Sequence, residues 1–516
     1  MPLFVLCLAA YAWFYQAGAW NQNVRFDLVR SLAEQGTSVI DDYYRNTGDL
    51  SCVGREGRCL DPDPAAGRHA YCDKAPGASW LALPIYAFLW AADGRAPSDA
   101  RFLVGASYLC TVFAVGVPTA LGAVLLSRMS RTFGVDRNVG VGSGLAYGLA
   151  TMVFPYATVL FGHSLAASLA IGGFSPLARL RHAPCGASTP RLLAAAGASL
   201  GAAVAVEYPC ALIAAILFLY AASFVRPLRR LGWLVLGGAA PALALTGYHW
   251  MVFGGPITLP YAFSTQPDRG QGLFMGIGAV DLHALWSILF SSYRGLFFSQ
   301  PWLLLAAPGL AVMARRPALR AEAAVCGAVF VLFAWMNASL VDWPSGWGFG
   351  PRYLIPAIPF LVVPAAVAFA VPIRRTALAL SFRLGVSGLV GWSAFLMLVA
   401  TSVTIDVPNS IERPFGEYLL PQFLAGELSV NEQGIDGEGD GEGVRQAWNL
   451  GRRAFGLDGL ASLAPLGGLF LVGGLWIGWT LRRFPSDTRA VAGARCAPPP
   501  VTGAPRSAPA ANSFRP

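Results

Sequence analysis

Apolar segments long enough to cross a bilayer recur along this chain and constrain its architecture more than any other feature. Inside a bilayer no water can bond the backbone, so a crossing segment must be a helix of about 20 residues. A hydrophobic content of 55%, a charged content of 13% and a mean hydropathy of +0.52 exclude an ordinary soluble protein. We therefore predict an all-α polytopic membrane protein with about 12 transmembrane helices. They lie near residues 2–19, 102–127, 139–157, 164–178, 192–206, 210–225, 231–250, 300–314, 321–339, 354–372, 384–403 and 459–480.

Arginines mark one side of the predicted helix bundle. Five short loops together hold fifteen arginines and a single acidic residue, Asp136. The positive-inside rule places such loops in the cytoplasm, and twelve spans with a cytoplasmic N-terminus put all five there. The apolar segment 79–93 must then not cross, and we predict that it is an interfacial or re-entrant helix on the outer face. The five loops are residues 128–138, 179–191, 226–230, 315–320 and 374–383.

The same topology assigns the long polar segments to the outer face. We predict one transmembrane domain over residues 1–484, with a first outer loop at 20–101 that contains juxtamembrane helices. A second large outer loop is predicted at 404–458. Residues 485–516 are rich in Pro and Ala and are predicted to be a disordered cytoplasmic tail. Because the polar residues gather in the outer segments, we expect the function to lie there.

Composition also indicates the compartment. The net charge of +9 comes from arginines between apolar segments, without the clustered basic patches that bind nucleic acid, so no nucleic-acid partner is predicted. The bias toward Arg and Ala suggests a bacterial protein of the inner (plasma) membrane. If the first outer loop faces an oxidising compartment, Cys52 and Cys59 form its simplest disulfide. We expect residues 1–19 to remain as an uncleaved span, although Ala17-Gly18-Ala19 resembles a signal-peptidase site.

The first outer loop carries carboxylates just above the membrane. The sequence predicts an amphipathic helix from about 21 to 35, stopped by Gly36 and followed by Asp41, Asp42 and Asp49. Clustered carboxylates in such a place suit acid and base chemistry. Taken singly, each could equally be a solvated cap on an interfacial helix.

Lys74 is the only lysine in a chain that otherwise carries its positive charge on 36 arginines. It lies between Asp73 and Ala75-Pro76-Gly77, where proline ends helical structure and glycine allows a close backbone approach. An ammonium group held so rigidly could pair with the phosphate of a membrane-embedded ligand. A local ion pair with Asp73 is the alternative.

The outer ends of later spans supply five more candidate binding residues. His163 in FGHS, and Glu207 with Tyr208 in VEYP, lie where the chain turns between spans. Ionisable groups near membrane depth are functional candidates. Arg294 and Arg352 each precede a span, the second within the glycine-rich segment DWPSGWGFGPRYLIPAIPF, and could hold a phosphate or a sugar. The alternatives are groups that reach interfacial water and an aromatic belt at the membrane surface.

Three segments give the chain a family resemblance. GTSVIDDYYRNTGD, DKAPGASWLALPIY and FGPRYLIPAIPFL resemble elements of the GT-C glycosyltransferases, particularly the family 39 relatives that include aminoarabinose and protein-mannosyl transferases. The resemblance covers roughly residues 1–400. It implies transfer of a sugar from a polyprenyl-phosphate donor to a glycan, lipid or protein acceptor at the periplasmic, outer face, usually with inversion.

The resemblance also implies roles for individual residues. A first-loop carboxylate would serve as base, and basic residues would hold the phosphate. Lys74 matches the lysine of the family's KPP element and would neutralise the leaving phosphate. Arg352 matches the late PRYL arginine, Arg294 is a further phosphate candidate, and His163 falls where relatives often carry a second acidic residue. A divalent cation shared by carboxylate and phosphate could contribute, and no other cofactor is predicted.

One position departs from the family pattern. Where relatives carry an Asp-Glu pair, this chain has Asn21 and Gln22, and neither amide can act as a base. Asp27, one to two turns along the same helix, and Asp49 are the predicted substitutes, with Asp41 as a third candidate.

Two other functions stay open from the sequence. A multi-span transporter or carrier-lipid flippase would also have many spans with buried polar groups, but it should have two related halves and polar residues at mid-membrane. Neither feature is found in this sequence. A non-catalytic relative that only binds a carrier lipid would account for Asn21 and Gln22.

Overall fold

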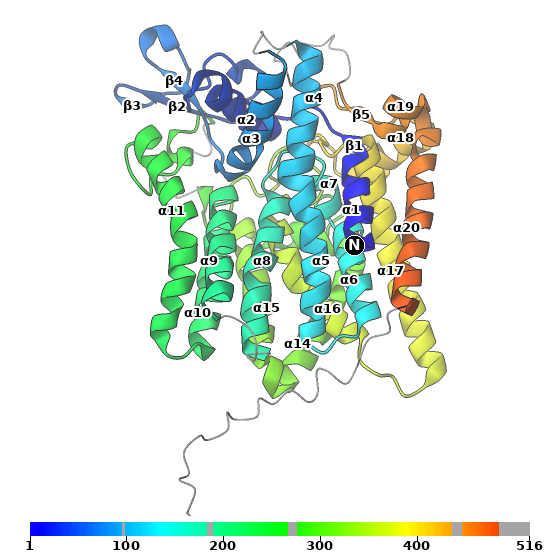
Figure 1. The fold of residues 1–516 in the computed structure, drawn as a ribbon. Helices are drawn as coiled ribbons and strands as arrows, with labels where there is room; N and C mark the ends of the chain where they lie inside the picture. Colours follow the sequence, from blue (N-terminus) through cyan, green and yellow to red (C-terminus); the bar gives the residue numbers. More distant parts are fainter. Residues whose placement is uncertain (95–98, 183–188, 267–275, 436–445, 484–516) are drawn as a thin grey trace, which may run out of the picture.

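Long apolar helices run side by side and carry loops, short helices and strands at one end, which is uppermost in Figure 1. The computed structural model describes residues 1–94, 99–182, 189–266, 276–435 and 446–483. The tail predicted at 485–516 lies outside these residues. The helices of the first half are α1 (Pro2–Ala12), α2 (Trp20–Arg30), α3 (Gly77–Ala92), α4 (Ala100–Thr111), α5 (Val117–Thr132), α6 (Arg137–Leu149), α7 (Val153–Tyr156), α8 (His163–His182), α9 (Thr189–Val206) and α10 (Cys210–Phe224).

The second half adds further helices to the bundle, reaches the upper end again after Val403, and finishes with a helix that runs back down beside α1 (Figure 1). Its helices are α11 (Gly232–Phe253), α12 (Leu282–Phe290), α13 (Leu296–Ser299), α14 (Ala306–Arg315), α15 (Arg320–Ala338), α16 (Ile358–Phe369), α17 (Thr376–Val403), α18 (Leu420–Ala425), α19 (Leu450–Phe455) and α20 (Ala464–Arg483).

The predicted helical membrane fold is confirmed. Seven helical stretches of the described chain are long and apolar enough to cross a membrane, and four shorter apolar helices accompany them. The number of twelve spans stays a prediction. The seven stretches are Ala100–Thr132, Thr189–Val206, Leu228–Phe253, Pro317–Ala338, Arg352–Phe369, Thr376–Val403 and Gly459–Arg483.

The first predicted span, 2–19, is wrong in its second half. Helix α1 ends at Ala12, and strand β1 (Phe14–Tyr15) pairs antiparallel with β5 (Trp448–Asn449). The amide of Asn431 donates to Gln16 O at 2.7 Å. This apolar segment therefore satisfies its backbone by pairing with the late outer loop, and it does not continue the helix.

The predicted span 139–157 is divided as well. Helix α6 ends at Leu149, and α7 begins only at Val153. Gln300 Oε1 accepts from Met152 N at 3.2 Å, and Trp302 Nε1 donates to Ala150 O at 3.0 Å. Neighbouring side chains thus bond the backbone groups that the break leaves free, as a helix break inside a membrane protein requires.

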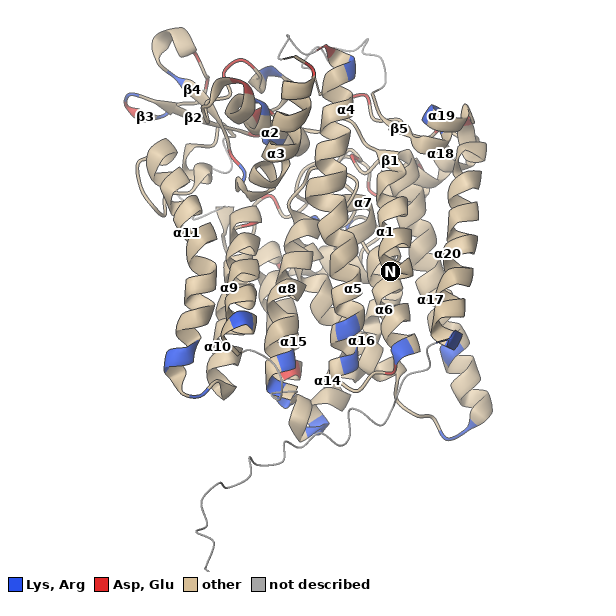
Figure 2. Cartoon of the chain, viewed as in Figure 1, with Lys and Arg blue, Asp and Glu red and all other residues tan. Residues whose placement is uncertain are grey.

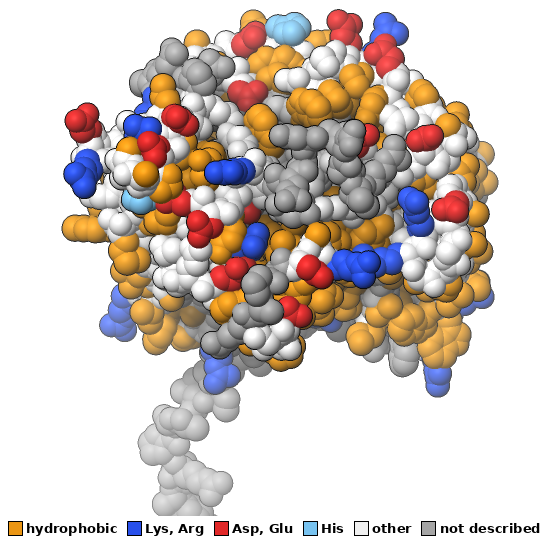
Figure 3. Space-filling view, turned by 90° about the horizontal axis from the view of Figure 1, so that it is seen from above, with side chains coloured by type: hydrophobic (Ala, Val, Ile, Leu, Met, Phe, Trp, Pro, Cys, Tyr) orange, Lys and Arg blue, Asp and Glu red, His pale blue; other side chains and the backbone are white. Residues whose placement is uncertain are grey.

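Charge divides the two ends of the bundle. Figure 2 shows Lys and Arg at the lower helix ends and most Asp and Glu among the upper loops. Seen from above in Figure 3, the upper end presents acidic, basic and hydrophobic side chains side by side. Helix α3, the predicted interfacial segment, lies beside α2 at this upper end (Figure 1). The arrangement agrees with the arginine loops and the polar loops facing opposite sides.

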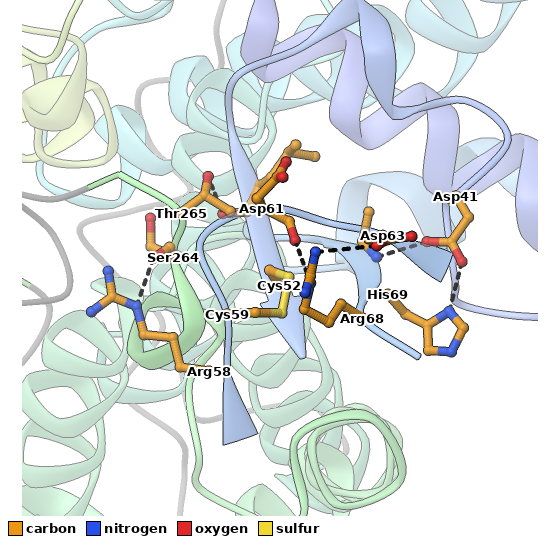
Figure 4. Close-up of a disulfide and its surroundings, with 12 residues drawn as sticks. Asp41, Cys52, Arg58, Cys59, Asp61, Asp63, Arg68, His69, Ser264 and Thr265 are labelled. Atoms are coloured by element: carbon orange, nitrogen blue, oxygen red, sulfur yellow. Dashed lines mark hydrogen bonds and ion pairs between the residues drawn. A yellow bond between two sulfur atoms is a disulfide. The ribbon is translucent and has the colours of Figure 1, made fainter. Parts of the chain in front are cut away.

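A small antiparallel sheet in the first outer loop has the strand order β3-β2-β4. The predicted disulfide between Cys52 and Cys59 closes its hairpin (Figure 4). Arg58 Nε donates to Ser264 O at 2.9 Å, which ties the sheet to the segment after α11. The strands are β2 (Leu50–Gly54), β3 (Gly57–Arg58) and β4 (His69–Cys72).

Helices α9 and α11 approach closely through glycine. A Cβ atom on Gly197 would lie 1.9 Å from Leu234 O, and one on Gly237 would lie 2.0 Å from Ala194 O. Small residues allow membrane helices to pack backbone to backbone, where dispersion contacts are most numerous. The pair α9 and α11 therefore depends on the absence of side chains at these two positions.

Two alanine substitutions within α11 test this packing. Gly237→Ala should lower the midpoint of thermal unfolding, because the new methyl group forces α9 and α11 apart. Gly247→Ala is the matched control, since a Cβ there meets open space, and alanine favours a helix by about 1 kcal/mol over glycine. Thermal unfolding of both variants in detergent measures the difference. Equal midpoints would contradict the close approach.

Candidate active site

A cavity of about 560 Å³ opens among the loops of the upper end, a volume typical of small-molecule sites. The first outer loop, the glycine-rich segment before α16 and the loop after α17 all contribute to its wall. Residues far apart in the sequence thus meet at one place. The lining residues are Ala19, Trp20, Asn21, Gly48, Asp49, Phe161, Thr265, Gln266, Asp342, Gly346, Trp347, Arg352, Asp406, Asn409 and Gln433.

Lys74 lies directly behind the cavity wall. Its Nζ is 3.0 Å from Asp49 Oδ2 and 2.9 Å from Asp73 Oδ2, and the side chain is buried. The ion pair with Asp73 that the sequence offered as an alternative is therefore present. Asp49 itself lines the cavity, and its Oδ1 accepts from Gln266 Nε2 at 3.0 Å. The lone lysine is therefore paired with two carboxylates, and it meets the cavity wall through Asp49.

Gly77 allows the segment around Lys74 to lie against the bundle. A Cβ on Gly77 would lie 2.6 Å from Ala205 O, near the outer end of α9. The close backbone approach predicted for this glycine is confirmed.

Arg352 is the cationic side chain that lines the cavity directly. It is buried, and its Nη1 donates to Trp347 O at 3.1 Å. Its Nε has no hydrogen-bond acceptor among the described residues. Arg352 brings a permanent positive charge to the cavity wall, and a guanidinium is suited to an anionic ligand because it can present parallel N–H bonds to a phosphate.

Arg294 does not line the cavity. Its Nη1 bonds Gly348 O, and its Nη2 donates to Gly346 O at 2.8 Å. Both acceptors belong to the glycine-rich loop, where Gly346 and Gly348 have positive φ angles of 65° and 158°. The structure therefore places Arg294 as a support for this loop, with its guanidinium bonded to main-chain carbonyls.

Glu207 and Arg25 join the first outer helix to the bundle. Arg25 Nη2 lies 2.9 Å from Glu207 Oε1, its Nη1 donates to Ala75 O at 2.8 Å, and its Nε donates to Asn21 Oδ1 at 3.0 Å. His163 Nδ1 lies 3.5 Å from the same Glu207 oxygen. Burial raises the pKa of Glu207, against the opposing charges of Arg25, Lys74 and Arg352.

Gly162 makes this arrangement possible. A Cβ on Gly162 would lie 2.2 Å from Glu207 Oε1, so no larger residue leaves room for the carboxylate. The FGHS turn therefore contributes both His163 and the space in which Glu207 meets Arg25.

Asn21 and Gln22, which replace the Asp-Glu pair of the family pattern, have different surroundings. Asn21 lines the cavity. Gln22 is buried and structural, since its Oε1 accepts from Leu160 N at 3.0 Å and its Nε2 bonds Ala17 O. Only Asn21 of this pair is therefore placed to meet a ligand.

Asp27 and Asp41 are not brought to the cavity. Asp27 is buried behind α2, where its Oδ1 accepts from Asn46 Nδ2 at 3.2 Å, and burial raises the pKa of this carboxyl well above its usual range. Asp41 lies at the edge of the small sheet and bonds Ala70 N at 2.7 Å and His69 Nδ1 at 2.6 Å (Figure 4). Of the three predicted carboxylates, only Asp49 lines the cavity.

Tyr208 also faces elsewhere. Its hydroxyl lies 2.9 Å from His249 Nε2, within an aromatic cluster beneath the first outer loop, and it does not line the cavity. It is placed to support the outer end of α9 and α10.

Sequence reasoning missed Asp406, which lines the cavity from the loop after α17. Its backbone N–H donates to Thr404 Oγ1 at 3.0 Å. Burial raises the pKa of this carboxyl to about 6, with a further increase from Asp49 and opposing effects from Arg352 and Arg294. The available signal was a single acid, in TIDVP, directly after an apolar span.

The comparisons with known proteins concern the fold. No protein-family model matches the chain, and no curated protein matches its sequence. The fold is similar to ArnT from Cupriavidus metallidurans bound to undecaprenyl phosphate, with a TM-score of 0.47 and 18% identity over 82% of this chain and 69% of ArnT. It is also similar to the archaeal oligosaccharyltransferase AglB from Archaeoglobus fulgidus, with a TM-score of 0.47 and 10% identity over 79% of this chain and 56% of AglB. Both similarities concern the fold alone.

The described residues contain no group of three or more His, Cys, Asp or Glu side chains arranged to hold a metal ion. A cation at this cavity would need further ligands, such as phosphate oxygens of a substrate. The divalent cation therefore stays a prediction.

The ion pair of Arg25 and Glu207 can be tested by stability. Arg25→Met should lower the free energy of unfolding by about 3–5 kcal/mol, because it leaves the carboxylate of Glu207, whose side chain is only 12% exposed, without its partner. Arg68→Met is the control, since Arg68 and Asp63 form a pair at 3.3 Å with side chains 41% and 43% exposed. Surface pairs of this kind contribute at most about 1 kcal/mol.

Chemical unfolding of the two variants in detergent gives both values. The double variant Arg25→Met, Glu207→Gln should recover part of the loss, since no charge is then left unpaired. Equal losses for Arg25→Met and Arg68→Met would contradict the structural role of the buried pair.

Proposed function

We propose that the protein is a membrane glycosyltransferase that moves a sugar from a polyprenyl-phosphate donor to an acceptor at the outer face of a bacterial inner membrane. One observation carries the proposal. A single cavity among the outer loops is lined by Arg352, Asp49 and Asn21, with the Lys74 ammonium 3.0 Å behind Asp49. The resemblance of the Lys74 and Arg352 segments to GT-C elements supports the same function.

The two cations suit a phosphate leaving group. When the bond between the sugar and the phosphate breaks, negative charge develops on the phosphate oxygen, and fixed positive charges nearby stabilise that transition state. Arg352 presents its charge to the phosphate from the cavity wall, and the Lys74 ammonium offsets the carboxylates of Asp49 and Asp73, which would otherwise repel the phosphate. Because both groups are buried, water screens them little.

The position of the cavity suits the two substrates. A polyprenyl chain stays in the bilayer while its phosphate reaches the membrane surface, where the outer loops begin. A glycan, lipid or protein acceptor approaches from the other side. Attack from the face opposite the phosphate would invert the configuration at the sugar.

A second candidate is a non-catalytic protein that binds a carrier lipid. Asn21 favours it, since an amide lines the cavity where the resemblance implies a carboxylate. The two functions share the phosphate site and differ in whether sugar is transferred.

Transfer assays with two cation variants test the proposal. Purified protein in detergent is given a panel of labelled polyprenyl-phosphate sugars and acceptors. Lys74→Ala and Arg352→Ala should each lower transfer by a factor of about 10²–10³, as expected when one charge-stabilising group is removed. Arg45→Ala, an exposed arginine of the same outer loop, should leave transfer unchanged.

Thermal unfolding of each variant separates loss of chemistry from loss of folding. Full transfer by folded Lys74→Ala and Arg352→Ala would exclude the proposed phosphate site. Carrier lipid bound in an Arg352-dependent manner, without transfer from any donor, would favour the non-catalytic protein.

A further inference from the structure

We infer that Asp406 is the catalytic base that takes the proton from an acceptor hydroxyl in the proposed transfer. This inference rests on the proposed function and names a residue and an acceptor class that the sequence did not indicate. It assigns to the loop after α17 a role that the resemblance implies for the first outer loop.

The other carboxylates near the cavity are engaged or placed elsewhere. Asp49 is bonded to Lys74 and Gln266, and Glu207 is bonded to Arg25. Protonating either one would remove a partner from a buried cation. Asp27 and Asp41 do not line the cavity, and Asp342, which does line it, already interacts with other groups, Arg352 among them. None of them is well placed to take a proton from a substrate.

Asp406 differs from these groups in its contacts. It lines the cavity, and none of the described residues donates a hydrogen bond to its carboxylate oxygens. Its side chain is therefore directed toward the space that a substrate would fill. A base must lie within hydrogen-bond reach of the proton that it removes.

The backbone around Asp406 is held on both sides. Gly348 N donates to Val407 O at 2.9 Å, and the Tyr293 hydroxyl donates to Asn409 O at 2.7 Å. On the other side, Val430 N donates to Val403 O at 3.0 Å. The segment that carries Asp406 is thus fixed against the glycine-rich loop that ends at Arg352. Asp406 and Arg352 therefore keep a fixed position relative to each other.

The charges around Asp406 suit a base at neutral pH. Its surroundings are the cations Arg352 and Arg294, the carboxyls of Asp49 and Asp342, and the phenol of Tyr156. With a pKa of about 6, the carboxyl is mostly ionised at pH 7 yet more basic than an ordinary aspartate. A base whose pKa lies near the working pH is the most effective.

The acceptor oxygen attacks the anomeric carbon, the bond from that carbon to the phosphate oxygen breaks, and its electron pair leaves with the polyprenyl phosphate. The hydroxyl proton passes to Asp406 and then to water. A base is needed when the attacking group must lose a proton, as a hydroxyl does and an ionised phosphate does not, so we assign the acceptor to the groups that carry such a proton and take a hydroxyl as the case to test.

The test is the pH dependence of transfer to a hydroxyl acceptor by the purified full-length protein. For the unmodified protein kcat/KM should rise about tenfold per pH unit below pH 6 and level off above it, because only the ionised base is active. Asp406→Asn should lower transfer at pH 7 by a factor of about 10²–10⁴ and abolish the rise with pH. It should still bind polyprenyl phosphate.

Three further variants sharpen the result. Glu412→Gln, an exposed acid of the same loop, should leave both the rate and the pH profile unchanged. Asp342→Asn, which removes another cavity carboxylate, should keep the rise with pH. Asp406→Glu should retain part of the rate and the pH dependence, which tests the inference even if Asp406→Asn fails to fold.

The outcomes separate this inference from the proposed function. If the unmodified protein transfers sugar and folded Asp406→Asn keeps its rate and pH profile, Asp406 is not the base, although the transferase function stands. If no donor of the panel supports transfer by the unmodified protein, both the proposed function and the role of Asp406 fall.

Discussion

The guanidinium of Arg25 holds together the segments on which the outer end of the molecule depends. It bonds Asn21 within its own helix, the carbonyl of Ala75 beside Lys74, and the carboxylate of Glu207 between α9 and α10. A buried guanidinium cannot lose its proton, so all its partners must be in place when the loop docks. The cavity wall at Asn21 and the position of Lys74 both follow from this docking.

Most helices could be predicted because their signals are local. Amphipathic spacing and the left-handed Gly36 that ends the first outer helix act within a few residues, as does the hairpin closed by Cys52 and Cys59. The end of α1 at Ala12 and the break after Leu149 could not be predicted in the same way. Their stabilising partners come hundreds of residues later or from another helix, and a local pattern carries no information about them.

The residue types of the candidate site could be predicted from the sequence, but the directions in which their side chains point could not. Lys74 could be identified as the lone lysine beside a proline and a glycine, and Arg352 as an arginine of a glycine-rich segment before a predicted span. Whether a side chain faces a cavity depends on packing, which is why Arg294 bonds carbonyls and Asp27 is buried behind its helix. Asp406 belongs to no motif, and only its place beside the other loops indicates a role.

The pairing of β1 with β5 has a consequence for how the protein is made. Phe14 and Tyr15 pair with Asn449 and Trp448, which are synthesised more than 400 residues later. At about 5–20 residues per second, the two strands emerge roughly 20 to 90 s apart. During that interval β1 and the loop that follows it lie at the membrane surface without their partner strand. They must therefore stay soluble during synthesis with backbone groups unpaired that are paired in the finished structure.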